Sequence, residues 1–194
     1  DMYEQSGEKQ SLLGGIVVGE PVSIEQIVEL FERFNKDVRV ARLFERVLSI
    51  AQKIKPTITF EILDDKVSGD FLLRNNSLRL NVHILNSEYL TDQEKASDIT
   101  HELLHAAVQY VVDAKERLNN QEALGIEIDN HMLDVAQSLI NIYNKVHNND
   151  LLKGEYGTKD VHEFISELSD PEFRKKLEQI HFAKRNMWQR IKDV

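Results

Sequence analysis

Apolar positions spaced three and four residues apart predict two consecutive helices in the first third of the chain. The first is expected to begin after Ser23, because Ser23 and Gln26 have the spacing of a capping box. A break is expected over residues 35–37, and Pro56 ends the second pattern. Each helix has one apolar face, which is typical of helices that pack on a core.

The start of the chain lacks this periodicity. Residues 1–20 are polar and then punctuated by glycines, so we expect a flexible arm or linker, with a short strand over residues 15–18. At this length one domain is the default, and the sequence predicts a single domain over residues 21–194. The chain begins at Asp1 without a signal-like segment, and we expect a domain cut from a longer polypeptide.

Strand-type alternation follows Pro56. Residues 57–63 alternate, with Ile62 expected on the buried face. Residues 70–74 and 77–84 flank Asn75-Asn76, a dipeptide that tolerates positive φ, so a hairpin is predicted. Apolar and polar residues alternate in the second arm, as in a small antiparallel sheet with one wet face. The fold class predicted is α+β, mostly helical with a small antiparallel sheet.

The pattern of apolar residues in the second half of the chain predicts helices joined by polar loops. Thr91 and Glu94 have capping-box spacing and open a helix to about residue 115. A similar pair, Asp160 and Glu163, opens a later one, and Pro171 suits the first position of another. We expect helices over residues 131–146, over 161–168 and from 171 onward, where the tail is helical and basic. We expect loops over residues 119–130 and 148–158.

The first of these later helices carries the sequence His101-Glu102-Leu103-Leu104-His105. Positions i and i+4 lie one turn plus about 40° apart, so both histidines project from one face and can bind one ion. Glu102 lies about 100° round from His101, where it can hold a water beside the metal. This pattern is typical of zinc hydrolases. Two core histidines at this spacing are the alternative, and the apolar surroundings favour a buried metal helix.

A catalytic zinc ion needs a third protein ligand. Glu163 and Glu167 lie at i and i+4 on a predicted helix, so one can bind zinc while the other accepts the N–H of a ligand imidazole. We expect Glu163 to be the ligand, with His131 as an alternative. Asp98, one turn before His101, competes with Glu167 for the supporting role.

These residues resemble a known family. His101-Glu-Leu-Leu-His105 with Glu163-Phe-Ile-Ser-Glu167 is similar to the gluzincin arrangement of thermolysin-like peptidases. It resembles still more the Glu-Phe-x-x-Glu element of lethal-factor-like toxins and of zincin domains in polyvalent phage and mobile-element proteins. The stretch from Ser169 to Arg174, Ser-Asp-Pro-Glu-Phe-Arg, is similar to that last group too.

The resemblance covers roughly residues 57–180 and implies a zincin-like fold with peptide-bond hydrolysis. Under it the metal ligands are His101, His105 and Glu163, the cofactor is Zn²⁺, and Glu102 is the catalytic base. The lethal-factor-like group also has a tyrosine seven residues before the glutamate ligand, and Tyr156 stands at that offset. The implied role of its hydroxyl is to stabilise negative charge on the former carbonyl oxygen. The long gap before Glu163 departs from the thermolysin group.

Amino-acid composition and net charge limit the kinds of partner that this chain can bind. A net charge of −9 and a pI near 5.3 argue against nucleic acid as the main partner, because no global positive field attracts phosphate. No apolar run is long enough to span a bilayer, and the absence of cysteine excludes thiolate zinc sites and disulfides. The expected partner is a peptide or protein substrate. The compartment is open, with the cytoplasm or a virion fitting best.

Two other functions are compatible with the sequence. The domain can be a catalytically silent structural or binding module, contacting nucleic acid or a neighbouring domain through a basic tail around Trp188. It can also process its own parent polypeptide, with no substrate supplied from outside. The basic residues of the tail are Arg174, Lys175, Lys176, Lys184, Arg185, Arg190 and Lys192.

Overall fold

The computed structural model describes residues 11–120, 130–168, 171–182 and 185–194. The chain has an α+β fold and forms two compact units, Asp1–Ala106 and Ala107–Val194. The single domain expected from residue 21 stays a prediction. Among the described residues, none of the helices has both the length and the apolar character needed to cross a membrane. The first unit contains η1 (Leu13–Gly15), β1 (Pro21–Val22), α1 (Ile24–Phe34), α2 (Val38–Ile54), β2 (Thr57–Glu61), β3 (Gly69–Leu72), η2 (Leu73–Asn75), β4 (Ser77–Asn81), α3 (His83–Asn86) and the first part of α4 (Asp92–Asn119).

The sheet of the first unit has four strands in the order β1-β2-β4-β3. β3 and β4 form the predicted antiparallel hairpin, and Asn76 in its turn has φ of +48°. β2 and β4, however, pair in parallel, so the sheet is mixed and the expected antiparallel sheet is wrong in this respect. Apolar residues alternate in the same way in parallel and in antiparallel strands, so the alternation could not distinguish the two orientations. β4 is central, and β3 is an edge strand.

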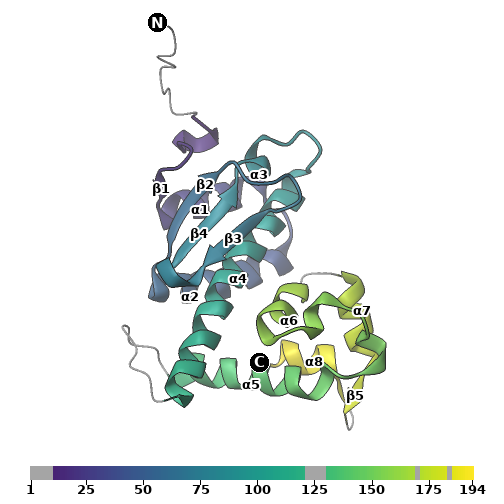
Figure 1. Ribbon diagram of the computed structural model, residues 1–194. Helices are drawn as coiled ribbons and strands as arrows, with labels where there is room; N and C mark the ends of the chain where they lie inside the picture. Colours follow the sequence, from purple (N-terminus) through teal and green to yellow (C-terminus); the bar gives the residue numbers. More distant parts are fainter. Residues whose placement is uncertain (1–10, 121–129, 169–170, 183–184) are drawn as a thin grey trace, which may run out of the picture. The chain divides into compact units, whose positions relative to one another are not determined.

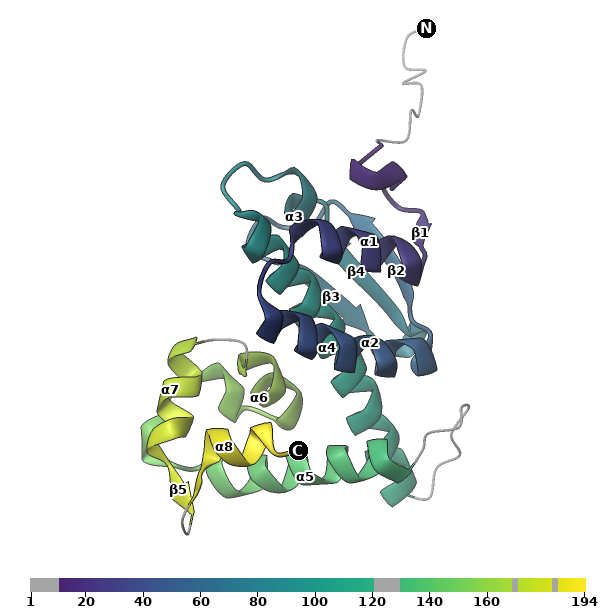
Figure 2. The ribbon, with the colours of Figure 1, turned by 180° about the vertical axis from the view of Figure 1, so that it is seen from behind.

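Helices α1, α2 and the beginning of α4 cover one face of this sheet (Figures 1 and 2). The side chains on that face are buried in matched pairs of β2 and β4, Ile58 with Leu78 and Phe60 with Leu80. The other face carries a polar row in which Arg79 of β4 pairs with Asp70 and lies 3.8 Å from Glu61. One wet face was expected from the alternation in β4.

The strands are shorter than the alternation predicts. β4 ends at Asn81, not at residue 84, because the Asn81 side chain accepts a hydrogen bond from the His83 amide at 3.1 Å and the chain turns into α3. β2 ends at Glu61, so the expected burial of Ile62 is wrong, and its side chain is 73% exposed. The short strand expected over residues 15–18 is reduced to an isolated bridge between Ser11 and Val17.

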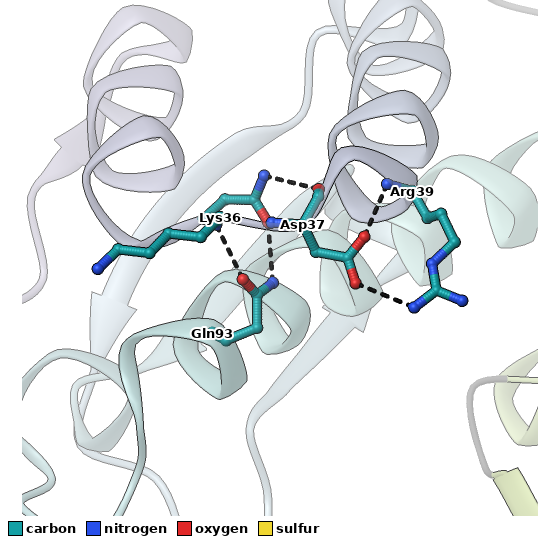
Figure 3. Close-up of polar contacts among 5 residues, drawn as sticks. Lys36, Asp37, Arg39 and Gln93 are labelled. Atoms are coloured by element: carbon teal, nitrogen blue, oxygen red, sulfur yellow. Dashed lines mark hydrogen bonds and ion pairs between the residues drawn. The ribbon is translucent and has the colours of Figure 1, made fainter.

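A polar junction joins the turn between α1 and α2 to the start of α4. Gln93 accepts a hydrogen bond from the Lys36 amide at 2.8 Å and donates one to the Asn35 side chain at 2.8 Å (Figure 3). Asp37 begins α2 by accepting the Arg39 amide at 2.7 Å. The predicted break over residues 35–37 is thus confirmed, and it also fixes the first turn of α4.

The second unit begins within α4, and its core includes residues of helices α6, α7 and α8. Phe164, Phe173, Leu177 and Met187 are each 0–1% exposed. The chain after Phe173 is not one helix, because a short hairpin separates α7 from α8, and the continuous helical tail is therefore a wrong prediction. Residues 121–129 of the expected loop over 119–130 lie outside the described residues. The elements are α5 (Asn130–Val146), η3 (Asp150–Leu152), η4 (Tyr156–Thr158), α6 (Val161–Glu167), α7 (Pro171–Gln179), β5 (His181–Phe182), β6 (Arg185–Asn186) and α8 (Met187–Lys192).

Candidate functional site

Helix α4 positions the histidines and the glutamate of the motif. Thr91 and Glu94 form the predicted capping box, in which the Thr91 hydroxyl accepts the Glu94 amide at 3.2 Å and the Glu94 carboxylate accepts the Thr91 amide at 2.7 Å. Ile99, Leu103 and Ala106 follow at intervals of four and three and are 0–1% exposed. This buried stripe fixes the rotation of the helix in the first unit, and with it the direction of the motif side chains.

His101 and His105 lie one turn apart on α4 with their ring centroids 4.6 Å apart, edge to face. Both rings are half-buried. Burial lowers the pKa of His101, and burial together with the neighbouring His101 lowers the pKa of His105 to about 4. Both imidazoles are therefore neutral at pH 7, which is the state that binds a metal ion.

Glu102 is buried, with 6% of the residue exposed. Burial raises the pKa of its carboxyl to about 6, against the lowering effect of a hydrogen bond from Ser68. The charges of Asp98 and Asp70 raise it further. Oε1 of Glu102 lies 3.9 Å from Nε2 of His101. A buried carboxylate with a pKa moved toward neutrality is suited to exchanging protons with a substrate.

Two residues beside Glu102 were not singled out from the sequence. The Ser68 hydroxyl donates a hydrogen bond to Oε1 of Glu102 at 2.6 Å. At Gly69, the first residue of β3, a β-carbon would lie 2.8 Å from Oε2 of Glu102 and 2.8 Å from the Arg79 carbonyl oxygen. The two contacts with Glu102 join residues more than thirty positions apart, so no local pattern in the sequence could reveal them.

Asp98, the proposed partner of a ligand imidazole, lies on α4 one turn before Glu102. Burial and the charge of Glu94 raise the pKa of its carboxyl, while His83 opposes the shift. Asp98 is thus a partly buried acid that adds negative potential at Glu102. Its supporting role toward His101 stays a prediction.

The second unit brings together two of the predicted residues. The Tyr156 hydroxyl donates a hydrogen bond to Oε1 of Glu163 at 2.8 Å, and this bond raises the pKa of the phenol. Glu163 is fixed in the first turn of α6 because its amide donates to the Asp160 side chain at 2.9 Å, as the predicted cap requires. The Lys159 ammonium lies over the Tyr156 ring, 4.1 Å from its centroid. Tyr156 itself is 49% exposed.

Glu167 lies at the end of the same helix, against the loop that carries Tyr156. A β-carbon at Gly157 would lie 2.9 Å from Cγ of Glu167, so a glycine is needed where the loop passes α6. His131, the alternative third ligand, is exposed in the first turn of α5. The roles of Glu163, Glu167 and His131 toward a metal stay predictions.

The residues of α4 fit a zinc ion in their chemistry. Two neutral imidazoles at i and i+4 supply two of the nitrogen ligands that zinc prefers, and the buried carboxylate stands beside them without replacing either. Within the described residues, no three or more side chains of His, Cys, Asp or Glu gather closely enough to hold a metal ion. A zinc ion bound by the histidine pair would therefore need a further ligand.

Comparison with family models, with curated proteins and with solved structures gave no match to this chain. The function is therefore inferred from the residues of α4, of the β2–β3 loop and of α6.

Proposed function

We propose that this protein is a zinc-dependent peptidase of the zincin type, a hydrolase of peptide bonds. The observation that supports the proposal best is the buried Glu102, whose pKa is raised to about 6 directly beside a pair of neutral histidines. A core helix with no chemical role has no reason to bury an ionisable group of this kind, because burial of a charge costs stability.

In the proposed reaction, His101 and His105 hold the metal, and Glu163 is the third ligand implied by the family resemblance. Zinc, when bound, polarises the scissile carbonyl and lowers the pKa of water. Glu102 accepts the proton of the attacking water and then donates it to the leaving amine, so the carboxylate is restored in each cycle. A pKa near 6 suits both transfers.

The edge strand β3 offers a place for an extended substrate. β4 is paired with β2 on one side and with β3 on the other, so neither of its edges is free for a substrate. β3 instead begins at Gly69, directly against Glu102, and has β4 as its neighbour on one side only among the described strands. A peptide that adds to β3 by main-chain hydrogen bonds would run past the catalytic base.

Main-chain pairing of this kind predicts sensitivity to backbone methylation. Peptide substrates in which an amide that pairs with β3 is N-methylated should bind at least about tenfold more weakly, since each lost main-chain hydrogen bond is worth about 1 kcal/mol and the methyl group also blocks the approach. The measurement is KM along a series of peptides methylated at one position each. Equal KM values along the whole series would contradict pairing with β3.

Tyr156 is proposed to donate a hydrogen bond to the developing oxyanion. Its hydroxyl already lies beside Glu163, at 2.8 Å, so the phenol and the proposed ligand are neighbours in the second unit. Tyr156→Phe should lower turnover roughly 10²-fold, the low end for one oxyanion donor, with little change in zinc affinity. The matched control is Tyr143→Phe, which removes a hydroxyl that donates to the Thr158 carbonyl at 3.0 Å and should leave turnover unchanged. Equal turnover in both variants would contradict the role.

The experiment that tests the proposal is metal analysis of purified protein followed by digestion of a peptide library. The expected result is about one zinc ion per chain and cleavage that stops with a chelator and returns with added zinc. Cleavage of library peptides would also separate this function from processing of the parent polypeptide alone. Protein that holds zinc but cleaves no peptide would refute the proposal and favour a silent module.

The alternative of a nucleic-acid-binding module has weaker support in the structure. Lys175 pairs with Glu172 at 2.7 Å, and Lys176 pairs with Glu155, so two of the tail cations are neutralised within the second unit. Arg174 lies over the Trp188 ring, 5.4 Å from its centroid, which engages the aromatic residue that would stack on a base.

A further inference from the structure

The β2–β3 loop, residues 62–68, brings a side chain to the proposed catalytic base from outside the motif. At its end the Ser68 hydroxyl donates a hydrogen bond to Oε1 of Glu102 at 2.6 Å. This distance is at the short end for O–H···O bonds and is typical of a hydroxyl that bonds to a charged acceptor. Glu102 is 6% exposed, so little water is available to replace this donor.

Ser68 is held by contacts that do not involve Glu102. The Asn81 amide of β4 donates to the Ser68 carbonyl oxygen at 2.8 Å. The Asn81 side chain, in a residue 2% exposed, donates to the carbonyl oxygens of Val67 at 2.7 Å and Asp64 at 3.0 Å. A central strand thus anchors the loop at three carbonyl groups, so the backbone position of Ser68 is set by the sheet.

The other carboxylate oxygen, Oε2, lies close to the backbone at Gly69. Gly69 passes so close that a β-carbon there would lie 2.8 Å from Oε2 and 2.9 Å from Cδ of Glu102. The hydroxyl on one oxygen and the backbone near the other leave the carboxylate little freedom to rotate. Oε1 lies 3.9 Å from Nε2 of His101.

We propose that Ser68 is a positioning residue of the peptidase, whose hydroxyl fixes the plane of the Glu102 carboxylate for proton transfer. The inference rests on the proposed function and adds a residue that the motif does not contain. Proton transfer needs the base within hydrogen-bond distance and in line with the proton, so loss of the restraint slows the chemical step without changing substrate binding.

The test compares Ser68→Ala, Ser68→Thr and Ser87→Ala with the wild type in full-length, zinc-loaded protein. Ser87 is a buried serine of the same unit whose hydroxyl accepts the Tyr89 amide at 3.1 Å, so its loss controls for removal of a structural hydroxyl. Ser68→Ala should lower kcat about tenfold to a hundredfold, the equivalent of one hydrogen bond to a charged group, with KM and zinc content unchanged. Ser68→Thr retains the hydroxyl at a half-exposed position and should restore most of kcat, and Ser87→Ala should keep it.

The outcomes distinguish this inference from the proposed function. If the zinc-loaded wild type cleaves no peptide, the proposed function fails and the positioning role fails with it. If the wild type cleaves and Ser68→Ala has an unchanged kcat, or a raised KM alone, only the positioning role is refuted. A Ser68→Thr variant that is folded and zinc-loaded yet as slow as Ser68→Ala also refutes it, because the hydroxyl would then not be the group that matters.

Discussion

The Glu102→Gln variant is expected to retain zinc and to hydrolyse peptides at least a hundredfold more slowly than the wild type. The amide has the shape of the carboxylate and can still accept the Ser68 hydrogen bond, but it cannot take a proton from water. Loss of a positioned general base costs about 10²–10⁴-fold in rate. Turnover on a peptide substrate and zinc content, measured on the same sample, check the result.

Glu61→Gln is a suitable control for this experiment. Glu61 is a partly exposed carboxylate of the same unit that lies 3.8 Å from Arg79 on the polar face of the sheet, and its neutralisation should leave turnover unchanged. Wild-type activity in Glu102→Gln with full zinc occupancy would exclude Glu102 as the base, and with it the proposed mechanism.

A comparison of the wild type with Glu102→Gln, both stripped of metal by a chelator, should show that Glu102 reduces stability at neutral pH. Its pKa is raised from 4.5 to about 6 on folding, a difference equivalent to about 2 kcal/mol at pH 7. The folded wild type binds this proton more tightly than the unfolded chain, so this group adds stability as the pH falls from about 6 to 4.5. Glu102→Gln should therefore have the larger free energy of unfolding at pH 7, and the advantage should disappear near pH 4.5.

Glu163→Ala is expected to lower zinc affinity by more than about 100-fold. A residue that only supports a ligand typically contributes 10–100-fold, so the loss of a direct ligand should exceed that range. Glu167→Ala should fall within it, and Glu172→Ala should have no effect because Glu172 is exposed and pairs with Lys175. Zinc affinity is measured by competition with a chromogenic chelator.

The same series distinguishes the possible third ligands. Wild-type affinity in Glu163→Ala together with a large loss in His131→Ala would assign the third position to the histidine at the start of α5. A large loss of zinc affinity in Glu167→Ala, with none in Glu163→Ala, would assign the ligand role to Glu167 and the supporting role to Glu163. Either result would refute Glu163 while preserving the histidine pair of α4.

Features encoded within one helical turn were predictable from the sequence. The capping boxes at Ser23 and Thr91 and the cap at Asp160 place side-chain and backbone partners three residues apart, and all three are present. The five residues from His101 to His105 lie in one helix, α4, for the same reason. The Tyr156–Glu163 hydrogen bond was not predicted, and it joins residues seven positions apart in η4 and α6.

Features that depend on distant pairing were not predictable. The parallel alignment of β2 with β4 leaves β4 central, and nothing in the alternation of either strand distinguishes this from an antiparallel pair. The Ser68–Glu102 hydrogen bond likewise joins residues 34 positions apart, in the β2–β3 loop and in α4. The motif was therefore evident, while the residue that orients its carboxylate became visible only in three dimensions.

The close approach at Gly69 has a consequence for how such sites are recognised across distant sequences. Position 69 supplies no acid, base or ligand, so a search for shared chemical groups would pass over it. Because glycine has no side chain, position 69 leaves the space that the Glu102 carboxylate occupies next to β3. The shape of a backbone is as much a part of this site as the functional groups that it surrounds.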